Sequence, residues 1–329
     1  MKKETASIHW SRQKEQATGY FQLKFLLGLF RIFPAVILRI IAFPVGFFYF
    51  LFSKTARTES KRFLKKAASF IDNPGLAKKC RSPFGPLRHI ISFSLTLIQK
   101  LETWSGKFSF KNICFHDDDS AELIQGLENG KGAFLIISHL GNAELLRGLA
   151  SFNRTGVSRE VPLTVIADRK VTGNFTRMLE ELNPRSSLDI MSADKLGPDA
   201  AVLLEEKLAA GEMVTIAGDR TSANEAEKVF TIPFLGDTAP FSTGIFYLAS
   251  LMNKPVYFIF ALRRGDLSIK AKYDLYVHKS GISNNTEQLS RKERLRQSSL
   301  LAGSYAAFLE SYTKKHPFQW YNFYDFWPK

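Results

Sequence analysis

Residues 132–151 read GAFLIISHLGNAELLRGLAS, and this stretch predicts the class of the fold. The apolar run 133–138 follows a glycine and ends at a turn, which is typical of a buried strand. The residues from Asn142 onward have the apolar spacing of a helix. His139 comes directly after the predicted strand, and ligands of α/β sheets bind outside the carboxyl ends of the strands. The unit therefore predicts an α/β sheet with His139 at its functional edge.

The same alternation continues to the end of the chain. We expect strands at 162–167, 188–191, 213–218, 255–264 and 268–277, and helices at 174–182, 198–211, 242–253 and 291–315. Strands that alternate with helices favour a mainly parallel sheet covered by flanking helices. Residues 67–131 are irregular: 92–104 predicts a helix, 83–90 a turn or loop, and 116–120 a solvated turn. Without an internal repeat or a long linker, one α/β domain over 67–329 is expected.

The basic character of the chain is concentrated at its N-terminal end. The formal net charge is +14, and residues 1–66 contribute +10 of it from 13 Lys/Arg and 3 Glu. The same end holds the most hydrophobic stretch, 25–52, whose longest charge-free run, Ile40–Phe52, has 13 residues. A membrane span needs about 20 apolar residues. We therefore expect 1–66 to form a separate segment that associates with a membrane.

Small and basic residues of this segment recur at helical spacing. On a helix they share one narrow sector, and they are Lys24, Gly28, Arg31, Ala35, Arg39, Ala42 and Gly46. This pattern predicts a helix in the membrane interface whose arginines reach the lipid headgroups. A buried pair of core helices and a tilted membrane span remain alternatives. Nucleic acid is not an expected partner, because the basic residues lie among Phe and Leu without a zinc-finger or RNA-recognition signature.

Several classes of protein are excluded by what the chain lacks. Two cysteines, Cys80 and Cys114, cannot form a disulfide framework, which favours a reduced, cytosol-facing compartment. The sequence has no Walker A loop, dinucleotide-binding glycine motif, H-E-x-x-H helix or G-x-S-x-G elbow. The other histidines have no metal-ligand spacing. We therefore expect neither a metal nor a cofactor.

His139 and Glu144 are the candidate catalytic residues. A turn through Gly141 could bring the Glu144 carboxylate to the imidazole, which would fix its tautomer and raise the basicity of the other nitrogen. In the alternative interpretation, Asn142 caps the helix and the histidine and glutamate are incidental surface residues.

The segment HLGNAE, residues 139–144, resembles the H-x4-D/E motif of glycerolipid acyltransferases, in the H-x-G-N-x-E form of bacterial lipid A late acyltransferases. Three further blocks are similar to that family in the same order, and they are 167–175, 214–249 and 317–327. The resemblance runs from about residue 20 to 327. The chain departs from the family at Asp168, Lys170 and Arg220, and its closing segment 317–327 lacks the basic pair that normally follows the aromatic residues.

The resemblance implies transfer of a fatty acyl chain from a thioester, on acyl carrier protein or coenzyme A, to a hydroxyl of a lipid acceptor. A lipid A precursor is the leading acceptor, and the cytoplasmic face of a bacterial inner membrane is the implied location. His139 would be the general base and Glu144 would orient it. The residues implied in substrate binding are Asn142, Arg169, Asn174, Arg185 and Asp219.

Stabilisation of the oxyanion in this reaction would fall to Arg169 or to backbone N–H groups near Gly141 and Asn142. Two other functions remain open. The chain could be a lipid-binding scaffold that keeps the fold without the chemistry, or a hydrolase that passes the acyl group to water.

Overall fold

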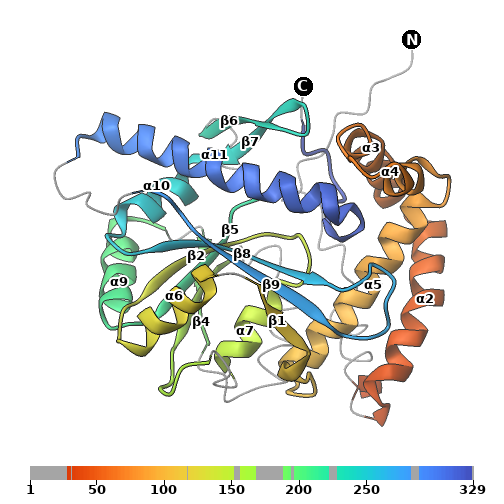
Figure 1. The fold of residues 1–329 in the computed structure, drawn as a ribbon, viewed down its shortest axis with the longest axis horizontal. Coiled ribbons are helices and arrows are strands. Elements are labelled where there is room, and N and C mark those ends of the chain that lie inside the picture. Colours follow the sequence, from red (N-terminus) through yellow and green to blue (C-terminus); the bar gives the residue numbers. More distant parts are fainter. Residues whose placement is uncertain are drawn as a thin grey trace.

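A computed structural model describes residues 28–30, 32–116, 118–151, 156–167, 188–193, 196–221, 228–282 and 289–327. These residues contain a seven-stranded sheet in the order β1-β9-β8-β2-β5-β3-β4 (Figure 1). In that order the strands are β1 (Ile113–Phe115), β9 (Tyr273–Lys279), β8 (Val256–Arg263), β2 (Ala133–Ile137), β5 (Met213–Ala217), β3 (Leu163–Ala167) and β4 (Leu188–Ser192). The five neighbours from β8 to β4 are parallel, whereas β9 is antiparallel to β8 and β1 is parallel to β9. The expected mixed α/β fold with a mainly parallel sheet is confirmed.

Both faces of this sheet are covered by helices (Figure 1). Phe134 and Ile136 of β2 lie in the core beneath α9 (Pro198–Ala209), α10 (Thr243–Leu251) and α11 (Arg291–Lys315). Leu135 and Ile137 point to the other core, which contains α6 (Asp118–Glu128) and α7 (Glu144–Ser151). A strand that is covered on both faces has no polar side, which explains the unbroken apolar run of β2.

The described part of residues 67–131 is more regular than expected. Helix α5 (Gly85–Trp104) begins well before residue 92, so the turn predicted for 83–90 is confined to residues 83 and 84. Pro86 lies in the first turn of this helix, where a missing N–H leaves no intrahelical bond unmade. The other elements of this part are the end of α3 (Lys54–Ala67), α4 (Pro74–Arg81), the short 3-10 helix η2 (Phe110–Asn112), β1 and α6, which begins inside the predicted solvated turn.

Two strand predictions also change. Strand β9 begins at Tyr273 rather than 268, because the preceding residues form the connection from β8, in which the Ser268 N–H donates to the Gly265 carbonyl at 3.2 Å. An unpredicted hairpin joins β6 (Val229–Phe234) to β7 (Asp237–Ser242) through Leu235 and Gly236, which both have positive φ. The helix expected at 174–182 lies outside the described residues.

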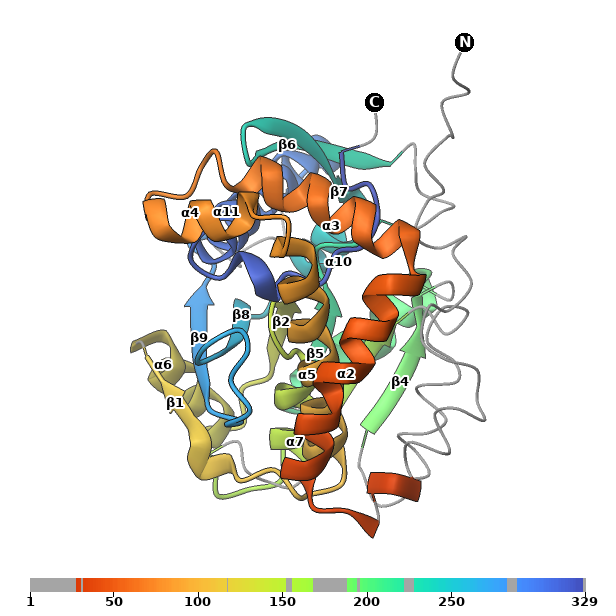
Figure 2. The same cartoon turned by 90° about the vertical axis from the view of Figure 1, so that its right-hand side faces the viewer.

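Helix α2 (Ala35–Phe52) lies along α5 (Figure 2). Its buried residues are Leu38, Ala42 and Gly46. A Cβ atom at Gly46 would lie 3.0 Å from the Ser94 Oγ and 3.1 Å from the Ile91 Cα, so the glycine allows the two helices to approach closely.

The polar stripe of α2 therefore faces the protein. Arg39 forms an ion pair with Glu102, a fully buried carboxylate of α5, and donates a 2.8 Å hydrogen bond to the Ile269 carbonyl. The expectation that Arg39 reaches lipid headgroups is wrong. A buried carboxylate without a cationic partner costs more free energy than a guanidinium that stays in water without a headgroup. Lys24 and Arg31 lie outside the described residues.

The opposite face of α2 exposes large apolar side chains. They are Val36, Ile37, Ile40, Ile41, Val45, Phe47, Phe48, Leu51 and Phe52, and we call them the outward face of α2. Among the residues that the structure describes, α2 is the one helix long and apolar enough to cross a membrane. An exposed apolar surface of this kind marks a site of interaction with a membrane or another protein.

His89 of α5 connects three parts of the chain. Its imidazole is fully buried and lies 2.9 Å from the Ser60 Oγ of α3 and 2.9 Å from the Trp320 carbonyl of the C-terminal segment. A carbonyl accepts only, so Nε2 carries the proton and Nδ1 accepts from the serine. The folded protein therefore holds this histidine neutral.

We expect this histidine to make the fold sensitive to acid. Burial lowers the pKa of His89 to about 4, whereas an unfolded chain has an ordinary pKa of about 6.5. The unfolded state then binds more protons as the pH falls, so the stabilisation is complete above about pH 6.5 and is lost towards pH 4. By linkage, the loss between pH 7 and pH 5 is about 2 kcal/mol. Denaturant unfolding at both pH values should show that His89→Gln reduces this pH dependence, and an unchanged dependence would contradict it.

Candidate active site

The register of the central strands brings His139 together with Asp219. β2 and β5 pair in parallel with Ile137 opposite Ala217. His139 and Asp219 each lie two positions beyond this pair. The His139 backbone N–H donates to the Asp219 Oδ2 at 2.8 Å, and the His139 Nδ1 lies 2.8 Å from Oδ1. The pair therefore stands at the carboxyl edge of the sheet, where α/β proteins bind their ligands.

Asp219 is an ionised carboxylate that accepts hydrogen bonds from three donors. Two are the backbone N–H and the Nδ1 of His139, and the third is the Trp320 Nε1, which donates to Oδ2 at 3.0 Å. Burial alone would raise the pKa of Asp219, but His139, Arg220 and these hydrogen bonds hold it at about 2. An ionised carboxylate can only accept, so Nδ1 of His139 carries a hydrogen and Nε2 has the free lone pair.

The imidazole of His139 is neutral and accessible. Its side chain is 38% exposed, whereas that of Asp219 is fully buried. Burial and the positive charge of Arg220 lower the pKa of His139, against the opposing effect of Asp219. A neutral imidazole with one nitrogen fixed by a carboxylate is arranged to accept a proton at the other.

The backbone of the loop after His139 is fixed by neighbouring segments. The Gly141 N–H donates to the Gln319 carbonyl at 2.8 Å, and the Asn142 N–H donates to the Ala261 carbonyl at 2.8 Å. Gly141 has φ 79°, and a Cβ there would lie 2.0 Å from the Ala261 carbonyl oxygen, so only glycine fits. Both N–H groups are thus engaged, which corrects the expectation that they are available to an oxyanion.

Glu144 does not occupy the expected place beside the imidazole. Its Oε2 accepts from the Trp104 Nε1 at 3.0 Å and from Arg147 at 2.8 Å, while Asp219 takes the position on Nδ1. Burial would raise the pKa of Glu144, but Arg147 and Lys100 lower it. The carboxylate that orients the histidine therefore comes from the strand beside β2, and Glu144 links α7 to α5.

The remaining predicted site residues divide into two groups. Asn142 is fully buried, and its Oδ1 accepts from the Glu144 N–H at 3.2 Å, which is the capping role of the alternative interpretation. Asp219, expected to bind substrate, is buried against His139. Arg169, Asn174 and Arg185 lie outside the described residues.

Three basic residues were missed: Lys100 and Arg220, which act on the pKa of His139, and Arg147, which pairs with Glu144. Arg220 follows Asp219 and donates to the Asn322 Oδ1 at 2.7 Å, with its guanidinium 4.6 Å from the centre of the Tyr324 ring. Arg147 of α7 lies over the Trp104 ring at 5.1 Å, and Lys100 precedes that tryptophan by one turn of α5. The one sequence signal was the departure from the family pattern at Arg220.

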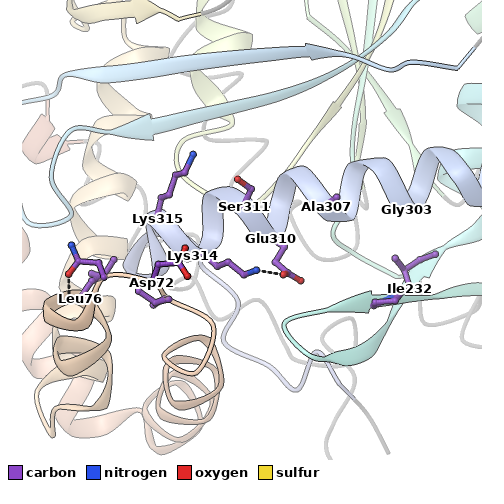
Figure 3. Close-up of a pocket in the computed structure, with 12 residues that line it drawn as sticks. Asp72, Leu76, Ile232, Gly303, Ala307, Glu310, Ser311, Lys314 and Lys315 are labelled. Carbon is purple, nitrogen blue, oxygen red and sulfur yellow. Dashed lines mark hydrogen bonds and ion pairs between the residues drawn. The ribbon is translucent and has the colours of Figure 1, made fainter.

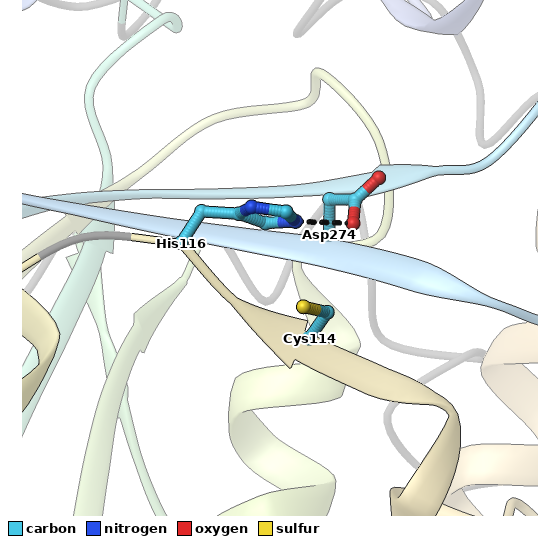
Figure 4. Close-up of side chains that lie close together, drawn as sticks. All are labelled: Cys114, His116 and Asp274. Carbon is cyan, nitrogen blue, oxygen red and sulfur yellow. Dashed lines mark hydrogen bonds and ion pairs between the residues drawn. The ribbon is translucent and has the colours of Figure 1, made fainter.

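One group of potential metal ligands lies at the edge of the sheet (Figure 4). The ligand atoms of Cys114, His116 and Asp274 lie within 4.8 Å of one another, and the His116 Nε2 pairs with the Asp274 Oδ1. The same oxygen accepts from the Arg264 Nε at 2.8 Å. Because a guanidinium already neutralises this carboxylate, the group is a hydrogen-bonded surface cluster, and we assign no metal to it.

A groove of about 800 Å³ lies between α4, α11 and β6 (Figure 3). Its charged lining includes Lys315 and the pair of Lys314 with Glu310, whose atoms are 2.5 Å apart. Among the predicted site residues that the structure describes, His139, Asn142, Glu144 and Asp219 do not line it.

Comparison of the chain with protein-family models finds no match, and comparison with curated proteins finds no relative. The residues and their geometry therefore carry the functional proposal.

Proposed function

We propose that this protein is an acyltransferase that moves a fatty acyl chain from a thioester to a hydroxyl of a lipid acceptor. The observation that carries the proposal is the pair of His139 and Asp219 at the carboxyl edge of a parallel sheet. The pair leaves one nitrogen of a partly exposed imidazole to act as a base, and the sequence around it resembles the H-x4-E motif of lipid A late acyltransferases. The proposed fold is correspondingly that of glycerolipid acyltransferases.

The chemistry needs one base and no covalent acyl-enzyme. The His139 Nε2 takes the proton of the acceptor hydroxyl while its oxygen attacks the thioester carbonyl carbon. Asp219 stabilises the imidazolium that forms, because its carboxylate is fixed at Nδ1. The tetrahedral intermediate then expels the thiolate, which takes the proton from the imidazolium. The products are the acyl ester and the free thiol.

The oxyanion of this intermediate needs a donor or a nearby positive charge. The backbone N–H groups of Gly141 and Asn142 are engaged, so the charge must come from elsewhere. Lys100 and Arg220 both lower the pKa of His139, so their positive charges act on the imidazole and are the candidates for this role.

The acceptor is proposed to be a membrane lipid, with a lipid A precursor as the leading candidate. Support comes from the outward face of α2, which would enter the apolar part of a bilayer while the polar stripe stays on α5. Basic residues of the adjoining helices are exposed and would attract anionic lipid or an acidic carrier protein, and they are Lys54, Lys61, Lys65, Lys78, Lys79 and Arg81. We place the protein at the cytoplasmic face of a bacterial inner membrane.

The function is tested by incubating full-length protein in detergent micelles with acyl carrier protein and coenzyme A thioesters and a panel of lipid acceptors. Mass spectrometry should find an acylated lipid that disappears in His139→Ala. Free fatty acid that forms equally well without an acceptor would indicate a hydrolase instead of a transferase. Intact thioester with every acceptor would favour the lipid-binding scaffold.

Membrane binding gives a separate prediction. Replacing Ile41 and Phe48 of the outward face by Glu should lower partition into anionic vesicles at least about ten-fold, because burying one large apolar side chain contributes about 1.5–3 kcal/mol. High salt should weaken binding of the parent only partly, since the apolar contribution does not depend on charge.

Leu300→Glu on α11 is the matched control, because Leu300 is 60% exposed and Phe48 is 57% exposed. Membrane binding is measured by vesicle co-sedimentation of the parent, the variant with both replacements in α2, and Leu300→Glu. Equal binding by all three would rule out α2 as the membrane-facing surface.

A further inference from the structure

The segment that follows α11 pairs with the loop that carries His139. The Gly141 N–H donates to the Gln319 carbonyl at 2.8 Å, and the Tyr321 N–H donates to the His139 carbonyl at 3.2 Å. Trp320 stands between these two bonds, in an antiparallel bridge to the residue after His139. The backbone on either side of Trp320 therefore fixes the position of the histidine in the fold.

The side chain of Trp320 reaches the carboxylate that orients His139. Its indole N–H donates to the Asp219 Oδ2 at 3.0 Å, and the same oxygen accepts from the His139 N–H at 2.8 Å. The other oxygen, Oδ1, lies 2.8 Å from the His139 Nδ1. Trp320 and Asp219 are both fully buried, so their hydrogen bond lies away from water and is stronger for it. One residue thus contacts both the loop of the proposed base and its carboxylate partner.

Packing fixes the direction of the indole N–H. The centre of the Trp320 ring lies 5.0 Å from that of Phe63 of α3 and 5.2 Å from that of Phe234 of β6, and both rings meet it edge to face. Phe326 packs against the ring in the same way at 4.9 Å. The backbone carbonyl of Trp320 accepts from the His89 Nε2 of α5 at 2.9 Å. The N–H therefore cannot turn away from the carboxylate unless the core repacks.

We infer that Trp320 is a positioning residue of the proposed reaction, which holds the Asp219 carboxylate and the His139 loop in one fixed arrangement. Because it is fully buried, it acts on the imidazole through Asp219 and the backbone rather than on a substrate. Its N–H also stabilises the ionised carboxylate, which limits how strongly that carboxylate favours a proton on the imidazole. The inference deepens the proposed function and rests on it for the kinetic test, whereas the effect on His139 is measured in the resting protein.

Removing the indole N–H should raise the pKa of His139. Among the residues that the structure describes, the carboxylate then keeps two donors, both from His139, and it attracts the imidazolium more strongly. The other groups whose charges act within this site are unchanged by the replacement, and they are Lys100, Arg220, Tyr305 and Tyr324. Asp219→Asn removes the negative charge itself and should lower the same pKa. A tryptophan that only fills space in the core would move this pKa in neither direction.

The pKa of His139 is measured by NMR titration of isotope-labelled histidine in the full-length protein in detergent micelles. The His139 signal is identified by its loss in His139→Ala. We expect a higher pKa in Trp320→Phe than in the parent. Trp327→Phe is the matched control and should leave the pKa unchanged, because it removes an indole N–H of the same segment that donates instead to the Phe234 carbonyl at 3.2 Å. An unchanged or lower pKa in Trp320→Phe would overturn the inference, whether or not the protein transfers acyl chains.

A second replacement separates the N–H from the shape of the ring, and it serves also where Trp320→Phe does not fold. Benzothienylalanine at position 320 has nearly the outline of tryptophan, with sulfur in place of the N–H. Its edge-to-face contacts with Phe63 and Phe234 therefore remain. It should reproduce the higher pKa of His139. A pKa equal to that of the parent would show that the volume of the ring matters rather than its N–H, and would overturn the inference.

Acyl transfer then tests the positioning role, at a pH above the acidic limb of each protein. Trp320→Phe should lower kcat by roughly ten-fold, the lower end of what a hydrogen bond to a charged group contributes, and leave KM within a few-fold of the parent. In the Asp219→Asn background the same change should lower kcat little further, because Trp320 acts through the carboxylate. An equal loss in both backgrounds, or a loss confined to KM, would overturn the positioning role. If the parent transfers no acyl chain, the proposed function fails, and the pKa of His139 in the variants alone decides whether Trp320 acts on the pair.

Discussion

His139→Ala should lower kcat/KM for acyl transfer by about 10²–10⁴-fold, the usual contribution of a general base. Under the proposal, Nε2 of the partly exposed imidazole takes the hydroxyl proton while Asp219 holds the other nitrogen. The measurement is the initial rate of lipid acylation with the variant and the parent at equal membrane loading. His116→Ala is the matched control, because it removes a similarly exposed histidine, 34% against 38%, from the edge of the sheet and should leave the rate unchanged. A rate within a few-fold of the parent for His139→Ala would eliminate this mechanism.

Asp219→Asn should have the second largest effect, a loss on the order of 10³-fold. An amide in place of the carboxylate can donate to Nδ1, which would move the proton to Nε2 and remove the lone pair that the base needs. Because Asp219 raises the pKa of His139 in the folded protein, the acidic limb of the pH–rate profile should move to lower pH in this variant. A variant that only loosened the fold would lower the rate without moving that limb.

Glu144→Gln distinguishes the two carboxylates. Glu144 binds Trp104 and Arg147 rather than the imidazole, so the variant should lose far less kcat than Asp219→Asn. Asp219→Asn combined with His139→Ala should be scarcely slower than His139→Ala alone, because the two residues act as one unit. A larger loss of kcat from Glu144→Gln than from Asp219→Asn would restore the carboxylate assignment drawn from the sequence.

The sequence by itself determined the local structure of the α/β part and the position of the histidine. Helix α11 has the predicted bounds of 291–315, and the apolar runs that became β2, β3 and β5 were identified to within a residue or two. Such elements are specified by the spacing of apolar residues along a short window, which the sequence displays directly. The place of His139 after a buried strand follows from the same local pattern.

The first residues of helices and the short strands were harder to predict from the sequence. Helix α5 begins at Gly85, inside a stretch whose glycine and prolines suggested a loop, and β1 has only three residues. Whether a proline ends a helix or occupies its first turn depends on what the next residues pack against. Here that packing includes His89, which contacts α3 and the C-terminal segment.

Only the tertiary structure decided the partners of the key side chains. The motif spacing favoured Glu144 for His139, but Asp219 lies there because β2 and β5 are in register across 80 positions of sequence. In the same way Arg39, which was expected to contact lipid headgroups, pairs with Glu102, which is 63 residues away. Strand register and helix docking are set by the packing of the whole core, and a local pattern of charges or apolar residues holds no information on which distant group completes an ion pair.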